Sequence, residues 1–147
     1  MDLPTPAATD APPQAAARGP AIVGFHHVRL PVTDVLTSRD WYIDTLGFQP
    51  LLVEENEAGV VGVALQQPSG VVLGLHRDAA RATALRGFVA VAFAVTDLGA
   101  WVAFFRSRNL PQAEPVDTHL GRSVRVRDPD GIIVELHTVT QPSAADA

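Results

Sequence analysis

The chain has 147 residues, a length that suits one folded domain and is too short for two ordinary ones. Hydrophobic residues make up 47% of it, which is enough to form a core. Its formal net charge is −5, every basic residue is Arg, and no basic stripe with interleaved aromatic residues occurs, which argues against a nucleic-acid partner. The absence of Cys excludes disulfides, thiolate metal sites and Cys nucleophiles. The richest apolar stretch, Phe88 to Val95, is too short to span a bilayer.

The two ends of the chain differ from its middle in composition. Residues 1–20 are rich in Pro and Ala and contain no aromatic residue, and residues 141–147 are similar. Such segments cannot bury enough apolar surface to offset the entropy of ordering, so they are predicted to be disordered tails. The folded unit is expected over residues 21–140. The first residues lack a cationic start followed by an apolar run, so a cytoplasmic location is expected.

The first half of the folded unit reads as a strand, a helix and three strands. The strand covers Phe25–Val32 and the helix Val35–Leu46, with Asp34 as its N-cap and Gly47 at its carboxyl end. The three later strands are predicted at Gln49–Glu55, Val60–Gln66 and Val71–Arg77. Pro68-Ser69-Gly70 forms a turn between the last two.

The second half repeats this order. Val32-Thr33-Asp34 recurs 63 positions later as Val95-Thr96-Asp97, and Trp41-Tyr42 is matched by Phe104-Phe105. The corresponding elements are a strand at Phe88–Val95, a helix at Leu98–Arg108 with Asp97 as its N-cap, and strands at Gln112–Val116, Ser123–Arg127 and Ile132–Thr138. Asp128-Pro129-Asp130-Gly131 supplies the last turn. The four aromatic residues at equivalent helix positions are predicted to pack the helices on the sheet.

The sequence therefore predicts an α+β fold of tandem βαβββ modules, at about residues 22–79 and 87–140. Their strands form a cupped, mixed β-sheet with the helices on its outer face. Neither module can bury both faces of its sheet alone, so the modules must pair, either within one chain or across a dimer. Both arrangements stay open.

Period-2 alternation predicts which residues face the helices and which face the cup. Bulky residues share the helix-facing side in the first and last strand of each module: Val28, Leu30, Val32, Val71, Leu73, Leu75, Val89, Val91, Phe93, Val95, Ile132, Val134 and Leu136. The opposite side carries His27, Arg29, Pro31, Val72, Gly74, His76, Ala90, Ala92, Ala94, Ile133, Glu135 and His137. His26 is expected to point away from His27. The small and polar side leaves room for a ligand.

These segments resemble the vicinal oxygen chelate superfamily, which includes glyoxalase I, bleomycin-resistance proteins, fosfomycin-modifying enzymes and extradiol dioxygenases. The resemblance is carried by Phe25-His26-His27-Val28-Arg29-Leu30, the Val-Thr-Asp and Trp41-Tyr42 that follow, Leu46-Gly47-Phe48, and Asp128-Pro129-Asp130-Gly131 with Val134-Glu135-Leu136. It covers nearly the whole folded unit. It implies the fold more specifically than the function, because this fold hosts isomerases, dioxygenases, thiol transferases and drug-binding proteins.

In the metal-dependent members, ligands come from the first and last strand of each module. The resemblance therefore implies His27 and Glu135 as ligands of a divalent ion such as Fe, Mn, Ni or Zn. The two other positions depart from the pattern, because they hold Ala90 and Gly74. His76 lies on the same face as Gly74 and is expected to compensate, giving the set His27, His76 and Glu135, with Glu135 also as the catalytic carboxylate.

Each of these residues has an ordinary structural alternative. Glu135 needs a partner because burying a carboxylate alone is costly, and either a metal or an Arg, at position 29 or 125, meets that need. Arg29 is a candidate for binding an anionic substrate group, and His137, Ala90 and Gly74 are candidate substrate contacts. His119 lies in a loop-like stretch and is expected at the surface.

Two functions follow from the resemblance. The first is a metal-dependent lyase, isomerase or dioxygenase that chelates a small oxygen-rich substrate and stabilises an oxyanion or enolate. The second is a protein that sequesters a small molecule in the same cup without a metal, as the bleomycin-resistance proteins do. A degenerate module with a structural or regulatory role is a third possibility. A homodimer is expected, with no nucleic-acid or membrane partner.

Overall fold

The computed structural model describes residues 19–110 and 114–139. The two predicted tails lie almost entirely outside these ranges, as does the first part of the strand expected at Gln112–Val116. In chain order, the elements are β1 (Val28–Val32), α2 (Val35–Leu46), β2 (Gln49–Asn56), β3 (Gly59–Gln66), β4 (Val72–Arg77), α3 (Ala79–Ala84), β5 (Val89–Val95), α4 (Leu98–Ser107), β6 (Val116–Thr118), β7 (Gly121–Arg127) and β8 (Ile133–Thr138).

The strands form two four-stranded sheets of the same topology. Sheet A has the order β1-β4-β3-β2 and sheet B the order β5-β8-β7-β6. The first and last strand of each module run parallel, and the other pairs are antiparallel. The predicted α+β fold of tandem βαβββ modules is thereby confirmed.

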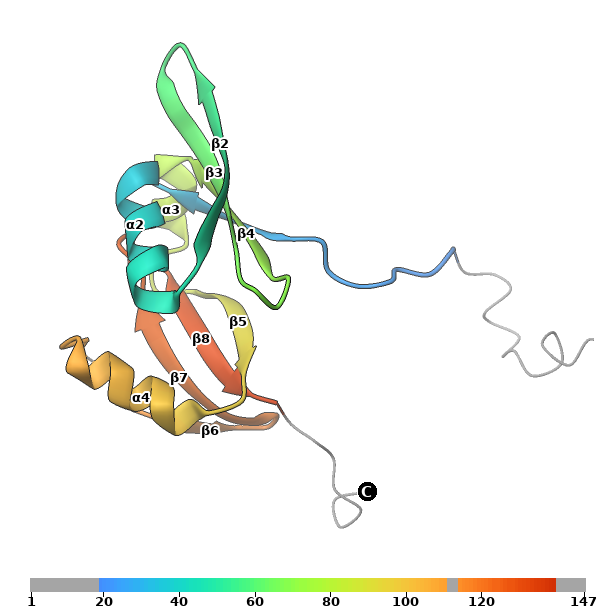
Figure 1. The fold of residues 1–147 in the computed structure, drawn as a ribbon, viewed down its shortest axis with the longest axis vertical. Helices are drawn as coiled ribbons and strands as arrows, with labels where there is room; N and C mark the ends of the chain where they lie inside the picture. Colours follow the sequence, from blue (N-terminus) through green and yellow to red (C-terminus); the bar gives the residue numbers. More distant parts are fainter. Residues whose placement is uncertain (1–18, 111–113, 140–147) are drawn as a thin grey trace, which may run out of the picture.

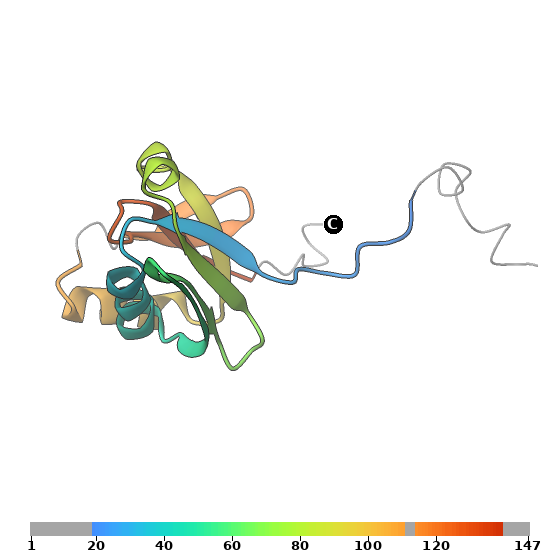
Figure 2. The same cartoon turned by 90° about the horizontal axis from the view of Figure 1, so that it is seen from above.

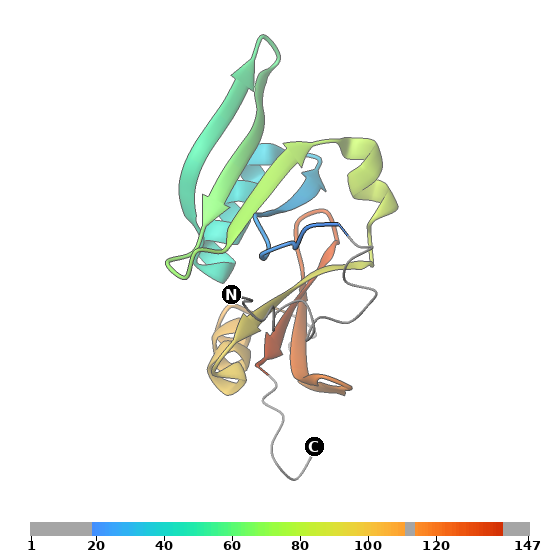
Figure 3. The same ribbon diagram turned by 90° about the vertical axis from the view of Figure 1, so that its right-hand side faces the viewer.

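Helices α2 and α4 lie on the same side of the two sheets, as Figure 1 and the view from above in Figure 2 show. Sheet A lies above sheet B in Figure 3, with β5 on the side of sheet B that faces sheet A. The β2–β3 hairpin projects beyond the rest of the fold, and the segment before β1 runs away from it (Figure 1). Within residues 19–110 and 114–139, neither α2 nor α4 covers the opposite side of the sheets (Figure 2).

Side-chain burial follows the predicted alternation in part. Of the residues that the sequence assigned to the helix side, Leu30, Val32, Leu73, Leu75, Val134 and Leu136 belong to the core, whereas Val71 is 38% exposed. The rest of the core comes from the helices and from other parts of the two modules: Val35, Tyr42, Leu46, Phe48, Val63, Leu65, Leu98, Val102, Phe105, Val124 and Val126. Trp41 and Phe104 are partly buried against this core. The predicted packing role of the four helix aromatics is therefore confirmed.

Local capping explains why both long helices begin and end where predicted. The carboxylate of Asp34 accepts a hydrogen bond from the amide of Thr37 (3.1 Å), and that of Asp97 accepts one from Ala100 (2.9 Å). Each satisfies an amide that the first helical turn leaves unpaired. Gly47 adopts the left-handed conformation, with φ 75°, and its amide donates to the carbonyl of Ile43 at the end of α2.

The main differences from the predicted elements concern β1, α3 and β6. The first strand begins at Val28, not Phe25, because the segment before it pairs with no neighbouring strand and leaves Phe25 98% exposed. The short helix α3 was not predicted; Asp78 caps it by accepting from the amide of Arg81. In the second module, β6 lies at Val116–Thr118, because the register pairs these residues with Ser123–Gly121.

A buried hydrogen bond joins the two modules. The hydroxyl of Tyr42 on α2 donates to Asp128, which precedes β8, at 2.9 Å, and both side chains are buried. Burial raises the pKa of Asp128 above its ordinary value, although the hydrogen bond from Tyr42 opposes that shift. Burial, with the Asp128 charge adding to it, also raises the pKa of Tyr42 well above that of free Tyr. This contact fixes α2 of the first module against the last turn of the second.

Replacing Tyr42 by Phe should lower the free energy of unfolding by about 1–3 kcal/mol, because it leaves a buried acceptor of Asp128 without its donor. Urea unfolding at neutral pH measures the loss. The D128N background is the control, since its uncharged amide reduces the cost of losing the hydroxyl. An equal cost of Y42F in both backgrounds would contradict the role given to the Tyr42–Asp128 contact.

Candidate functional site

The uncovered side of sheet A, called here the sheet A face, is built from cross-strand neighbours. One row joins Glu54 on β2, Gly62 on β3 and His76 on β4. The next row joins Leu52, Ala64, Gly74 and, on β1, Arg29. Because Gly62, Ala64 and Gly74 lie side by side, the middle of this face has almost no side-chain bulk.

That missing bulk forms a cavity of about 300 Å³. Its polar lining comes from His26, His27, Arg29, Glu54 and His76, and its apolar lining from Leu51, Leu52, Val63, Ala64, Val72 and Leu75. Gly62 and Gly74 form part of its wall. A mostly apolar hollow with a few polar groups is typical of a site for a small molecule.

A second cavity, of about 380 Å³, lies where β1 and β4 of sheet A approach β5 of sheet B. His27 lines both cavities, and the row of small residues from Ala90 to Ala94 lines the second. Of the predicted substrate contacts, Arg29 and Gly74 thus line the first cavity and Ala90 the second.

The expectation that His26 points away from His27 is wrong. Their Nδ1 atoms lie 3.0 Å apart, so one ring donates to the other, and both residues line the same cavities. The physical reason is that β1 begins only at Val28, so residues 26 and 27 are not held in the alternation of a paired strand. Both imidazoles are largely exposed.

Glu135 lies in a different environment from His27 and His76. It is 7% exposed on β8, and one of its carboxylate oxygens accepts from Nε of Arg125 on β7 at 3.0 Å. Arg125 is therefore its partner, as one of the two alternatives predicted, and Arg29 is not. Glu135 does not line the cavity that contains His27 and His76.

The divalent metal that the resemblance implies needs several ligands that converge on one point. Across residues 19–110 and 114–139, no group of three or more His, Asp or Glu side chains is arranged to hold a metal ion. His27 and His76 share a cavity, but Glu135 is engaged by Arg125. The set His27, His76 and Glu135 thus does not come together within this single chain, and its role as a metal site stays a prediction.

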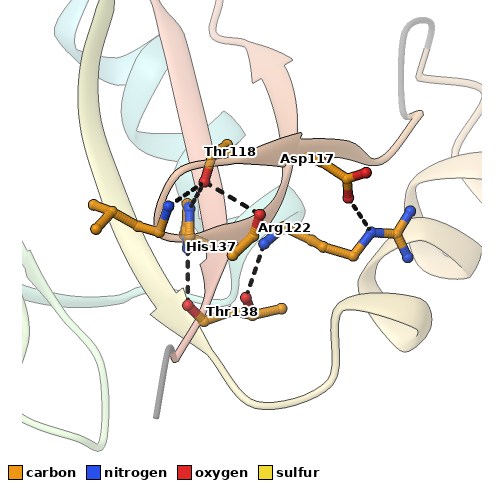
Figure 4. Close-up of polar contacts among 7 residues, drawn as sticks. Asp117, Thr118, Arg122, His137 and Thr138 are labelled. Atoms are coloured by element: carbon orange, nitrogen blue, oxygen red, sulfur yellow. Dashed lines mark hydrogen bonds and ion pairs between the residues drawn. The ribbon is translucent and has the colours of Figure 1, made fainter. Parts of the chain in front are cut away.

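His137 is held by neighbouring strands, as Figure 4 shows. Its Nδ1 lies 2.8 Å from the carbonyl oxygen of Thr138, to which it donates, and its Nε2 lies 2.7 Å from the Thr118 hydroxyl, which is also hydrogen bonded to the carbonyl oxygen of Gly121 at 3.2 Å. The amide of Arg122 also donates to the hydroxyl oxygen of Thr138. Both ring nitrogens of His137 are therefore occupied in fastening the β6–β7 hairpin to β8. His119, in the turn of that hairpin, is exposed as expected.

Glu54 and Gly62 are among the cavity residues that the sequence did not predict. Each looks ordinary within its own strand, and only the β2–β3 register places Glu54 beside Gly62. That register includes irregularities between Pro50 and Leu52 and between Glu54 and Glu55, which alternation alone does not reveal.

The profile of the Glyoxalase/Bleomycin resistance protein/Dioxygenase superfamily matches residues 24–136. The chain belongs to this superfamily. A comparison with curated protein sequences found no match. None of the helices in the described part of the chain has the length and apolar content needed to cross a membrane.

Several solved structures share the fold of this superfamily member. An antibiotic-binding protein, TnmS3 from Streptomyces sp. CB03234, is 24% identical with a TM-score of 0.68, over 82% of this chain and 99% of that one. The fosfomycin resistance protein FosX from Listeria monocytogenes is 16% identical (TM-score 0.62; 82% and 96% covered). A lactoylglutathione lyase from Agrobacterium tumefaciens is 19% identical (TM-score 0.62; 80% and 95% covered). These structures include an antibiotic-binding protein, an antibiotic resistance protein and a lyase.

Replacing Arg125 by Met should destabilise the fold by about 1–3 kcal/mol, because it leaves the buried carboxylate of Glu135 without a partner. Arg125 is itself half exposed, so the loss should be smaller than for a fully buried ion pair. Chemical unfolding of R125M measures the loss. The double variant R125M/E135M should recover most of it, since neither charge then remains. If R125M unfolds like the wild type, the ion pair does not stabilise Glu135.

Proposed function

We propose that this chain binds a small molecule against the sheet A face and does not use a resident metal to transform it. Gly74 and Ala90, at two of the four positions that carry ligands in metal-dependent relatives, offer no ligand and instead widen the two cavities. The apolar residues that line most of both cavities suit burial of an apolar ligand body. The antibiotic-binding relative supports this choice.

The Glu135–Arg125 ion pair is the observation that carries this proposal. Glu135 is the carboxylate that the superfamily pattern assigns to a metal, and its charge is already balanced by a guanidinium at 3.0 Å. A metal at this carboxylate has to compete with that pair. Sheet B is therefore better suited to form a wall of a binding site than to hold a metal ion.

A metal-dependent enzyme is the second candidate, because His27 and His76 line one cavity. The relatives that support it are FosX, one structure of which contains Mn(II), and the lactoylglutathione lyase. In this alternative, Glu135 of a second copy completes the set with His27 and His76, and Fe, Mn, Ni or Zn occupies it. The reaction is then that of a lyase, isomerase or dioxygenase.

We also propose that the protein is a homodimer in which the sheet A face of one copy meets sheet B of the other. The support is apolar surface that a monomer leaves in water. Leu51, Leu52 and Val53 on the edge strand β2 are each about half exposed, and Ile22 and Phe25 before β1 are almost fully exposed. Unpaired apolar edge strands and contiguous apolar surface mark sites of association.

The metal and ligand alternatives separate in one series of measurements. Protein purified without chelators should contain no stoichiometric transition metal, and its melting temperature should rise with a member of a panel of apolar antibiotics. H27A should reduce that rise, and H119A, which changes an exposed His outside the cavities, should not. One metal ion per chain, lost in H27A and retained in H119A, would instead establish the metal-dependent alternative.

The dimer is tested by placing a charge on the exposed edge. L52E should shift the protein from dimer to monomer in analytical ultracentrifugation, because the carboxylate on the sheet A face would be buried in the interface without a partner. E55Q, which changes an exposed neighbour on the same strand, should leave the dimer intact. A wild-type protein that sediments as a monomer at all accessible concentrations contradicts the proposal.

A further inference from the structure

We propose that Glu54, Gly62 and His76 form an amine-binding subsite within the cavity of the sheet A face, and that the ligand carries a primary amine on an apolar body. This inference rests on the proposed function, because it assumes that a small molecule occupies this cavity. It adds the charge and position of the group that the ligand presents.

The three residues are direct neighbours across strands β2, β3 and β4. A Cβ atom at position 62 would lie 3.2 Å from the carbonyl oxygen of Leu75, 3.3 Å from the Oε2 atom of Glu54 and 3.5 Å from the Nδ1 atom of His76. The backbone of Gly62 is not in the left-handed region, so its conformation does not require glycine. What the glycine provides is the close approach of the Glu54 carboxylate and the His76 imidazole over its backbone, and both side chains line the cavity, where one donor group of a ligand can reach both.

Both flanking groups are available for a ligand. Among residues 19–110 and 114–139, Glu54 and His76 have no hydrogen bond or ion pair with another side chain, unlike Glu135 and His137 on sheet B. A carboxylate only accepts hydrogen bonds, and an imidazole nitrogen without its proton does the same. A primary ammonium has three donors on one atom and satisfies both acceptors at once.

The charges around the cavity give the ligand a direction. Residues 49–66, which form the β2–β3 hairpin, contain three Glu and no Arg, and the nearby Arg77 of β4 donates to the carbonyl oxygen of Ala58 in the hairpin turn at 3.5 Å. Arg29 lies on β1, at the opposite edge of sheet A from β2. A cationic group is therefore attracted to Glu54 and repelled from Arg29. Leu51, Leu52 and Val63 line the same cavity and provide contacts for an apolar body.

The experiment uses two fragments of matched size and opposite charge, phenethylamine and phenylacetate, titrated into the full chain and followed by amide chemical shifts. Phenethylamine should shift the amides of Gly62 and Gly74. In E54Q its affinity should fall at least about fivefold, because a charge-assisted hydrogen bond is lost, and that of phenylacetate should not fall. E55Q removes the same charge from the next residue, which does not line the cavity, and should bind phenethylamine like the wild type.

A second variant tests the close approach over Gly62. G62A places a methyl group between Glu54 and His76 and should weaken phenethylamine binding while the protein remains folded, as its far-ultraviolet circular dichroism would show. Equal phenethylamine affinity in wild type, E54Q and G62A, with shifts that still map to the sheet A face, overturns the amine subsite and leaves small-molecule binding intact. No shift at this face with either fragment counts against the subsite and against the proposed function together.

Discussion

The constraint on which the rest of the structure depends is the alternation of bulky and small residues along β4 in sheet A and β5 in sheet B. In β4, Leu73 and Leu75 are almost completely buried against the helices, and Gly74 between them faces the opposite side. Successive side chains of a strand point to opposite faces, so the two faces of one strand can have different roles. Leu73 and Leu75 stabilise the core, and Gly74 leaves space for the cavity on the opposite face.

The parts of the fold that were predictable are those that local signals determine. Helix α2 spans the predicted residues because Asp34 and Gly47 act through hydrogen bonds to amides and carbonyls within one helical turn. The start of β1 was not predictable in the same way. Phe25 has high strand propensity, but a strand needs a partner, and β4 pairs with β1 only from Val28 onwards. The wrong orientation assigned to His26 follows from that single boundary.

The candidate site was predictable only where its residues lie on the first and last strands of a module. Arg29, Gly74 and His76 follow from period-2 alternation and line the cavity, and His27 lines it from the segment just before β1. Glu54 and Gly62 depend on the register of β2 against β3, which two irregularities displace and which no spacing in the sequence encodes. The partner of Glu135 was undecided for the same reason: Arg29 and Arg125 are equivalent by charge, and only the pairing of Arg125 with Glu135 across β7 and β8 separates them.

The two modules share a topology but differ in how their polar groups are satisfied. On sheet B, Glu135 is paired with Arg125, and both nitrogens of His137 are hydrogen bonded. These polar groups are therefore engaged in contacts within the protein. On the sheet A face, Glu54, Arg29 and His76 surround a floor of Gly and Ala. An unpaired charge at the edge of a hollow retains its full capacity to interact with a ligand, whereas a paired one must first give up its partner. This difference between the two modules supports the proposed function, in which the first module contacts the ligand and the second provides a stable wall beside it.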